Sequence, residues 1–334
     1  MAVDAADPRA RVLVSGSPRI LVLRRDNIGD LVCTTPLIAA LRAQLPTAWL
    51  GALVTTYNGE VLAGNPALDE VFVYEKLKHR SGGLLSHLRS RLGQLSRLRE
   101  RKIDCVLVPA PSPQALKQAR GLKPGRVIAA ASVAPLRQHE VERCYEVGRA
   151  LGLAGKPGPL QLFADAQKQV ELRTRLGAGP FVAVHISARR PLQRWPLERY
   201  AALAAQLSKE ARVILLWAPG AADSPGHPGD DAAAAEVMRL AGSAILPVAT
   251  PDLKTLIAAL SLAGCVVCPD GGAMHLAAGL GKPVVALFGD SPVERWRPWG
   301  VPHRVVRPES RNLADLPLAP VIEAFAELGS EVAG

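Results

Sequence analysis

One stretch in the last third of the chain combines an acid, glycines and a histidine in a spacing that suits phosphate binding. The apolar run Cys265 to Cys268 is followed by Asp270-Gly271-Gly272, and a helical pattern containing His275 then begins. Glycines let a ligand approach the backbone closely, and the free N–H groups at a helix start favour an anion. These residues predict a phosphate or pyrophosphate site, although a tight strand-to-helix turn would need the same glycines.

Two side chains of this stretch each have two interpretations. Asp270 lies at the tip of a predicted strand, where it would either accept hydrogen bonds from sugar hydroxyls or cap the following helix. His275 lies one helical turn further on, where it would either face a ligand or pack in the core. Both pairs of alternatives stay open at the level of sequence.

A second polar cluster lies near the N-terminus and reads Arg24-Arg25-Asp26-Asn27-Ile28-Gly29-Asp30. Asp30, at a predicted turn between a strand and a helix, would either cap the helix or serve as the base that takes a proton from an attacking hydroxyl. Arg24 and Arg25 would hold that carboxylate ionised or bind an anionic acceptor. The cluster is therefore compatible with transfer of a group to a hydroxyl.

A third segment, basic in character, follows the predicted strand Phe181 to Ile186 and leads into a helix. Its arginines are Arg189, Arg190 and Arg194. Cations at such a place would neutralise a diphosphate leaving group as charge develops on it. A solvated basic loop is the alternative interpretation.

Strand and helix patterns alternate along the chain and must position these segments. Strands are predicted at Ile20–Arg24, Trp49–Thr55, Val71–Tyr74, Cys105–Pro109 and Val127–Ala130, and the pattern restarts at Phe181–Ile186, Val213–Trp217, Cys265–Cys268, Val284–Phe288 and His303–Val306. This alternation predicts an α/β fold with two doubly wound parallel sheets. Because ligands bind beyond the carboxyl ends of such strands, two facing sheets would place a ligand in the cleft between them.

The expected domains are an N-terminal extension over 1–18 and two Rossmann-like domains over 19–160 and 161–334. The last helix would pack back on the domain over 19–160. The first 18 residues lack an apolar core segment and are not expected to be a secretory signal. No run of 18 uncharged apolar residues occurs, so no membrane-spanning helix is expected.

The formal net charge of +10 is concentrated in one segment. Residues 76–102 contain nine Lys or Arg and one acid, Glu100, a net +8. Leucines recur there at helical spacing with arginines between them, which suits either an anionic membrane surface or an ordinary helix packed on the sheet. A nucleic-acid binder would also be basic, but the segment lacks interleaved aromatic residues, so no nucleic-acid partner is expected.

The five cysteines are expected to be reduced and buried, as in a cytosolic protein. Cys265 and Cys268 form a CxxC pattern, but no second pair of ligands has zinc spacing. No metal site is therefore predicted.

Several of these motifs resemble glycosyltransferase family nine, the lipopolysaccharide heptosyltransferases. The segment from Arg24 to Asp30 resembles an N-terminal motif of that family, and Arg194-Trp195-Pro196 resembles its Lys/Arg-Trp-Pro element. The run from Asp270 to Gly289 resembles the family's Asp-Thr/Ser-Gly-x-x-His-Leu-Ala-Ala signature. A segment from His139 to Arg143 also resembles one of the family, and the motifs keep the family order over about residues 19–300.

The resemblance implies a GT-B fold and an inverting, metal-independent transfer of heptose from ADP-heptose to a lipopolysaccharide core acceptor, without a cofactor. It implies that the domain over 19–160 binds the acceptor and that the domain over 161–334 binds the nucleotide sugar. It implies that Asp30 is the general base and that the acceptor is contacted by Arg24, Arg25, Asn27 and Arg143. It implies that the donor is bound by Ser187, Arg190, Arg194, Asp223, Asp270, Gly271, Gly272 and His275. The acceptor would be an anionic lipid-linked saccharide, which implies a cytoplasmic protein peripheral to the inner membrane that contacts it through 76–102.

The chain departs from the family pattern at two places. Gly271 stands where the family usually has Thr or Ser, so a hydroxyl donor is missing. His185-Ile186-Ser187 replaces a turn that is usually similar to Asn-Pro-Gly. Asp223 is the candidate for the ribose, but residues 224–230 resemble a local insertion. A different nucleotide-sugar donor on the same fold is the main alternative.

Overall fold

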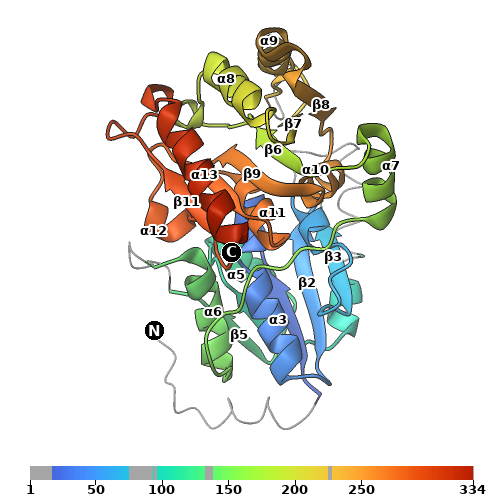
Figure 1. The fold of residues 1–334 in the computed structure, drawn as a ribbon. Helices are drawn as coiled ribbons and strands as arrows, with labels where there is room; N and C mark the ends of the chain where they lie inside the picture. The colour runs from blue at the N-terminus through green and yellow to red at the C-terminus, as the bar shows by residue number, and fades with distance from the viewer. Residues whose placement is uncertain (1–16, 75–92, 94–95, 132–137, 225–227, 334) are drawn as a thin grey trace. The chain divides into compact units, whose positions relative to one another are not determined.

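The structure is a computed structural model, and it describes residues 17–74, 93, 96–131, 138–224 and 228–333 (Figure 1). The chain divides into two compact units, Met1–Pro159 (unit 1) and Leu160–Gly334 (unit 2). Each unit is built around one parallel sheet. The predicted α/β class with two parallel sheets is therefore confirmed.

Unit 1 contains a five-stranded sheet in the order β3-β2-β1-β4-β5. Its strands are β1 (Arg19–Leu23), β2 (Trp49–Thr55), β3 (Glu70–Tyr74), β4 (Cys105–Val108) and β5 (Arg126–Ala129). Its helices are α2 (Ile28–Val32), α3 (Thr35–Gln44), the 3₁₀ helix η1 (Gly59–Leu62), α5 (Pro113–Gly121) and α6 (Glu140–Leu151). The central strand β1 is a continuous apolar run because helices cover both faces of such a sheet.

Unit 2 contains a six-stranded sheet in the order β11-β10-β9-β6-β7-β8. Its strands are β6 (Phe181–His185), β7 (Arg212–Trp217), β8 (Ile245–Ala249), β9 (Ala263–Pro269), β10 (Val284–Leu287) and β11 (His303–Val306). Its α-helices are α7 (Ala166–Leu176), α8 (Leu197–Leu207), α9 (Asp231–Ala241), α10 (Leu253–Ser261), α11 (Gly272–Gly279), α12 (Val293–Trp296) and α13 (Ala319–Ala333), and its 3₁₀ helices are η3 (Pro191–Gln193), η4 (Gly242–Ala244) and η5 (Leu313–Asp315).

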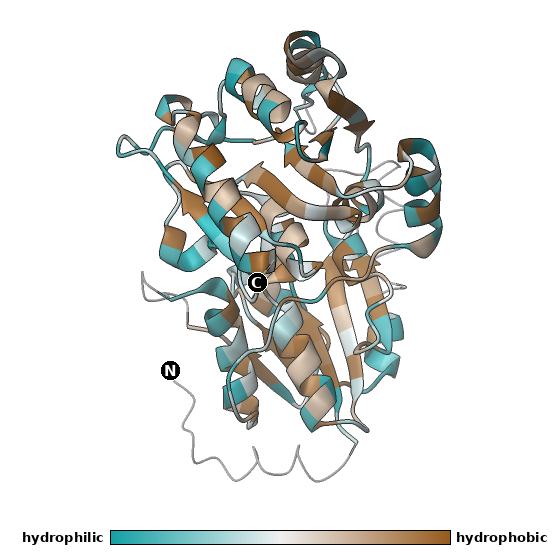
Figure 2. Cartoon of the chain, in the orientation of Figure 1, coloured by the Kyte–Doolittle hydropathy of each residue, from teal (hydrophilic) through white to brown (hydrophobic). Residues whose placement is uncertain are grey.

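The apolar side chains of the unit 2 strands alternate between the two faces of the sheet. One face packs against α8 and α13 and includes Val182, Val184, Val213, Leu215, Val285 and Leu287. Figure 2 shows the apolar character of the strands in brown, with polar residues on the outer parts of the helices. Since side chains alternate along a strand, His185 lies on the opposite face of β6 from Val184.

In both sheets the strand order reverses direction at one place. In unit 1 this place lies between β1 and β4, and in unit 2 it lies between β6 and β9. Loops that follow strands at such a point form the usual ligand-binding crevice of open α/β sheets. The segment after Leu23 and the segment that begins with Asp270 both lie at these points.

Two segments fold differently from their sequence patterns, and one strand was not predicted. The turn expected at 26–30 contains the start of helix α2, and the helical pattern over 58–65 forms only the short 3₁₀ helix η1. Strand β8 was not predicted, because Pro247 argues against a strand except at an edge, which is where β8 lies. The final helix begins at Ala319 and packs against β10 and β11.

Within the described part of the chain, no helix combines the length and the apolar character needed to cross a bilayer.

Candidate functional site

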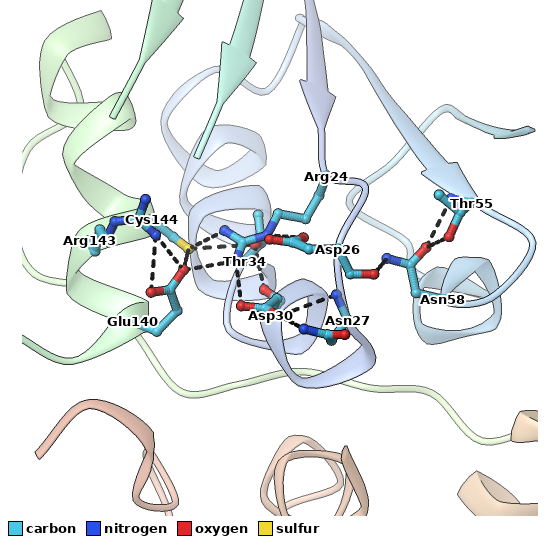
Figure 3. A network of polar contacts seen from close by, with 10 residues as sticks. All are labelled: Arg24, Asp26, Asn27, Asp30, Thr34, Thr55, Asn58, Glu140, Arg143 and Cys144. Carbon is cyan, nitrogen blue, oxygen red and sulfur yellow. Dashed lines mark hydrogen bonds and ion pairs between the residues drawn. The ribbon is translucent and has the colours of Figure 1, made fainter. Parts of the chain in front are cut away.

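The first candidate site is a buried group of polar side chains in unit 1 around one guanidinium (Figure 3). We call it the Arg24 cluster, and its members are Arg24, Asp26, Asp30, Glu140, Arg143 and Cys144. Arg24 directly follows β1, and its side chain is 0% exposed. Its Nε donates to Asp26 at 2.7 Å, and its Nη1 donates to the sulfur of Cys144 at 3.1 Å. Its Nη2 donates both to Asp30 at 2.9 Å and to Glu140 at 2.8 Å.

Asp30 is held through both of its carboxylate oxygens. Oδ1 accepts from Arg24, while Oδ2 accepts from the backbone N–H of Asn27 at 3.2 Å and from its side-chain amide at 2.9 Å. Asn27 is the N-cap of α2 and Asp30 lies in its first turn, so Asp30 does cap this helix. Its side chain nevertheless keeps 12% exposure. The capping and the base interpretations of Asp30 are therefore compatible.

Helix α6 supplies the other side of the cluster. Glu140 is its first residue, with a side chain that is 0% exposed. Arg143, one turn later, donates through Nη1 to both oxygens of Glu140, at 3.0 and 3.2 Å. The start of α6 is fixed by His139, whose ring Nδ1 accepts from the backbone N–H of Val141 at 3.1 Å.

The electrostatics of the cluster follow from burial and from Arg24. Burial raises the pKa of Asp26, an effect that the neighbouring guanidinium opposes. Burial alone would lower the pKa of Arg24, but Cys144 and the three acids hold it well above its usual value. The pKa of the Cys144 thiol is raised to about 12 by burial, so this cysteine is a neutral acceptor rather than a nucleophile.

Of the other predicted acceptor residues, Arg143 belongs to this cluster, Asn27 donates to Asp30, and Arg25 follows Arg24 in the chain. Arg25 is half-buried, donates to the hydroxyl of Tyr74 and has its guanidinium 5.1 Å from the centre of that ring. Asn27 is exposed, and Arg143 is 9% exposed. Arg24, in contrast, is wholly enclosed, so the structure gives it a role inside the protein rather than the acceptor contact expected from sequence.

The second candidate site lies in unit 2, where loops after β6, β9 and β10 meet. We call it the Asp270 cluster, and its members are Arg190, Gln193, Asp270, Asp290 and Ser291. The side-chain amide of Gln193 donates to Asp270 at 2.8 Å and to Ser291 at 3.0 Å. Burial raises the pKa of Asp270, and hydrogen bonds from Ser291 and Gln193 oppose this rise. Asp270 does not cap α11, whose N-cap is Gly271 without a side-chain hydrogen bond.

The start of α11 has room for a ligand against its backbone. A Cβ added at Gly271 would meet nothing within 4 Å among the described residues, and its φ of 164° is ordinary extended backbone. A Ser or Thr side chain would therefore fit here, so Gly271 is not required by the turn. The first N–H groups of α11 have no intrahelical acceptor, which suits an anion.

Of the other predicted donor residues in the segment after β6, Arg190 belongs to the Asp270 cluster, and Arg194 and Ser187 contact residues outside it. Arg190 pairs with Asp290 and approaches Ser291 at 3.5 Å, and Arg194 pairs with the buried Asp230 at 3.2 Å. The hydroxyl of Ser187 accepts from the backbone N–H of Ala218 at 2.9 Å. Arg190 and Arg194 thus have different acidic partners.

Two further donor candidates take different positions. Asp223 is exposed in a turn after β7, whereas Asp230 and Asp231 lie at the start of α9, where their backbone N–H groups donate to Ala218 and Gly220. Asp231 accepts from the indole of Trp217 at 2.7 Å and from the backbone N–H of Gly220 at 2.9 Å. His275 is 3% exposed and packs edge-on against Trp296 with 5.9 Å between ring centres.

Sequence reasoning missed several members of these clusters. Glu140 and Cys144 were not assigned as site residues, and neither were Gln193 and Ser291. The segment His139 to Arg143 was noticed as a motif, and that was the available signal for Glu140. Nothing in the sequence pairs Gln193 with a residue 98 positions later.

Metal ligands and thiol chemistry receive no support from the described residues. Within these residues no group of three or more His, Cys, Asp and Glu is arranged to hold a metal ion. The five cysteines are free thiols, and four of them are buried. Of the basic segment 76–102, only 93 and 96–102 lie within the described residues, so the membrane surface expected there lies largely outside them.

The amino-acid sequence of the chain is similar to sequences of known glycosyltransferases. The profile of glycosyltransferase family 9 (heptosyltransferase) matches residues 119–317, more than half of the chain. Lipopolysaccharide heptosyltransferase 2 of Salmonella typhimurium is 27% identical over 321 residues, which cover 86% of this chain and 88% of that protein.

Two solved structures share the fold of the chain. A glycosyl transferase family 9 protein of Veillonella parvula aligns with a TM-score of 0.79 at 19% identity, over 94% of this chain and 97% of that chain. ADP-heptose lps heptosyltransferase II of E. coli aligns with a TM-score of 0.75 at 21% identity, over 95% of this chain and 100% of that chain. These alignments confirm the GT-B-like fold expected from the sequence.

Proposed function

The chain belongs to glycosyltransferase family 9, the heptosyltransferases, and from this premise we propose that it transfers a heptose from ADP-heptose to a lipopolysaccharide core acceptor. The observation that carries the proposal is Asp30. Its carboxylate is fixed by three hydrogen bonds to both oxygens and still keeps part of its surface exposed. Such a fixed and accessible carboxylate is suited to act as a general base on an incoming hydroxyl.

The proposed reaction is a single displacement with inversion. The acceptor oxygen forms a bond to the anomeric carbon of the heptose while the bond from that carbon to the diphosphate breaks. Asp30 takes the hydroxyl proton, and the electron pair of the broken bond leaves with the diphosphate oxygen. The developing negative charge requires preorganised N–H groups or cations on the leaving-group side.

Unit 2 supplies groups of that kind. The start of α11 at Gly272 presents backbone N–H groups, and its dipole favours negative charge. Arg190 and Arg194 have side chains that are 55% and 43% exposed, so both can reach a phosphate while keeping their acidic partners. Ser187, Gly271 and His275 stay proposed donor contacts, and Asp270 is proposed to accept from sugar hydroxyls.

One assignment changes with the geometry. For the ribose we favour the acids at the return of the loop after β7, Asp230 and Asp231, beside the exposed Asp223. Both lie at the start of α9, and their backbone N–H groups donate to the loop directly after β7, the second strand of unit 2, where an acid is suited to hydrogen bonds with ribose hydroxyls.

The acceptor side is proposed to use the exposed Asn27 together with Arg25 and Arg143. Lipopolysaccharide core is anionic, so basic residues near Asp30 would attract it. The segment 76–102 would bring the protein to the cytoplasmic face of the inner membrane. Metal independence is part of the proposal: the negative charge that develops on the diphosphate would be stabilised by Arg190, Arg194 and the N–H groups at the start of α11.

A donor panel tests the proposal directly. The full chain is incubated with a de-acylated lipopolysaccharide core acceptor and, separately, with ADP-heptose, UDP-glucose, GDP-mannose and a deoxysugar nucleotide, and the products are read by mass spectrometry. Of the four donors, we expect only ADP-heptose to add a heptose mass to the acceptor. We also expect ADP to protect the protein against thermal unfolding. Transfer of a hexose or deoxysugar instead would favour the alternative donor on the same fold, and it would refute the heptose assignment.

A further inference from the structure

We propose that Arg24 and Glu140 form a buried positioning pair that fixes the Asp30 carboxylate and selects which of its oxygens receives the acceptor proton; this inference rests on the proposed function of Asp30. Arg24 is a positioning residue in this account, not a group that touches the substrate. Its guanidinium links the end of β1, the first turn of α2 and the first residue of α6.

The first argument is the shared nitrogen. Nη2 of Arg24 donates to Asp30 Oδ1 at 2.9 Å and to Glu140 Oε1 at 2.8 Å, and the side chains of Arg24 and Glu140 are both 0% exposed. Asp30, at 12%, is the member of this trio that remains open. The pair is therefore an enclosed support for one accessible carboxylate. Figure 3 shows Arg24 between Asp30 and Glu140.

The second argument counts acceptor positions. A carboxylate has about four lone-pair sites. Asn27 occupies two positions on Oδ2 and Arg24 occupies one on Oδ1. The position left for an incoming hydroxyl is therefore on Oδ1, the oxygen that Arg24 holds.

The third argument concerns the anchoring of the pair. Glu140 is fixed from its other side by Arg143, which donates to both of its oxygens. Its place at the N-terminus of α6 also favours a negative charge. Nε of Arg24 is fixed separately by Asp26. Rotation of the guanidinium would break these bonds together, so Asp30 is held against a rigid support.

A purely structural role is the competing explanation. An apolar pair of similar volume would fill the same space without the desolvation cost of buried charges. Joining β1 to α6 through buried charges therefore carries a desolvation cost that an apolar pair would avoid, and an action on Asp30 would account for that cost. The two explanations predict different effects of an Arg24 substitution once Asp30 is removed. A positioning residue acts through Asp30 and would have no further effect on the rate, whereas a structural residue would still have one.

A double-mutant cycle separates them, with transfer of heptose from ADP-heptose to the de-acylated core acceptor as the assay. Arg24→Lys keeps the charge but loses the fork that reaches three acids. We expect kcat to fall by about tenfold to a hundredfold, as for a misplaced catalytic group, while the donor KM changes by less than about twofold. In the Asp30→Ala background, Arg24→Lys should cause no further loss.

Equal fold-losses from Arg24→Lys with and without Asp30 would show a structural role and overturn the proposal, as would an unchanged kcat. If Asp30→Ala alone keeps the parental rate, the proposed function of Asp30 fails, and this single variant shows that failure independently of any change at Arg24.

Arg42→Lys is the matched control, because Arg42 is a structural arginine of unit 1 that holds Asp69 at 2.7 Å and three backbone carbonyls. It should leave kcat unchanged. If Arg24→Lys fails to fold, Glu140→Gln carries the same cycle, since it keeps the shape and removes the charge that holds Arg24.

Discussion

Asp30 differs from the other acids around Arg24 because it combines several fixed hydrogen bonds with an accessible edge. Glu140 is fully enclosed, and Asp26 is more exposed, at 33%, but has a pKa raised by burial. A base must be ionised, oriented and reachable, and Asp30 meets the last two conditions by geometry. The motif around Asp30 was recognisable from sequence, whereas the partners Glu140 and Cys144 lie 116 and 120 residues away from Arg24 and are brought to it by α6.

His185 provides a test of single-residue burial in unit 2. It is 7% exposed, its Nδ1 has no hydrogen-bond partner among the described residues, and burial lowers its pKa from 6.5 to about 4. His185 therefore binds a proton below about pH 6.5 in the unfolded chain, but only below about pH 4 in the folded chain. The contribution of neutral, buried His185 to the unfolding free energy is therefore complete above pH 6.5 and is lost as the pH falls towards 4.

From this shift we expect the parent to lose about 2 kcal/mol more unfolding free energy than His185→Leu between about pH 7.5 and about pH 5. Urea unfolding followed by tryptophan fluorescence reports mainly on unit 2, because four of the five tryptophans lie there. Parallel pH dependence in the two proteins would show that His185 is not kept neutral by the fold.

At the scale of elements, the two candidate sites occupy equivalent places in two similar sheets. Each lies at the carboxyl ends of the central strands, where the strand order reverses. The alternating pattern of apolar strands and helices was enough to predict these strands, because each is a continuous buried run. The contacts between loops were not predictable, since the Gln193 bridge between β9 and the loop after β10 depends on how three loops pack.

Gly289 tests how closely those loops must approach. A Cβ at this position would lie 2.1 Å from the backbone oxygen of Leu192, so Gly289→Ala must displace η3 and with it Gln193. We expect the donor KM to rise by about tenfold or more, because Asp270 loses its aligned hydrogen-bond partner. Steady-state kinetics measure the donor KM, and isothermal titration calorimetry measures the affinity for ADP-heptose.

Gly264→Ala in β9 is the control for that substitution, because its Cβ would meet nothing closer than 3.8 Å among the described residues. It should bind the donor like the parent. Parental donor affinity in Gly289→Ala would mean that the position of Gln193 does not matter for the donor.

At the scale of the whole molecule, charge is distributed unevenly. The segment 76–102 has a net charge of +8 out of +10 for the chain. Its composition of leucines and arginines indicated a surface for anionic lipid, and this interpretation stays a prediction. A patch of this charge would contribute on the order of 1 kcal/mol per basic residue near an anionic bilayer.

We expect the full chain to sediment with vesicles that contain about one-third phosphatidylglycerol, and to be released by salt at about 0.5 M, because counter-ions screen this attraction. Arg89→Glu with Arg91→Glu should weaken the binding severalfold. The same double change at the exposed Arg173 and Arg175 of α7 should not. Equal weakening by both pairs would indicate a general charge effect rather than a lipid surface on 76–102.

The most direct test of the account removes the carboxylate of Asp30 and measures the two halves of the function separately. Asp30→Ala leaves Arg24 paired with Asp26 and Glu140, so unit 1 should still fold. We expect heptose transfer to fall by about a hundredfold to ten-thousandfold, the usual contribution of a general base, while protection of the protein by ADP against thermal unfolding stays at the parental level. Transfer at the parental rate, in a variant that binds ADP normally, would contradict the central claim.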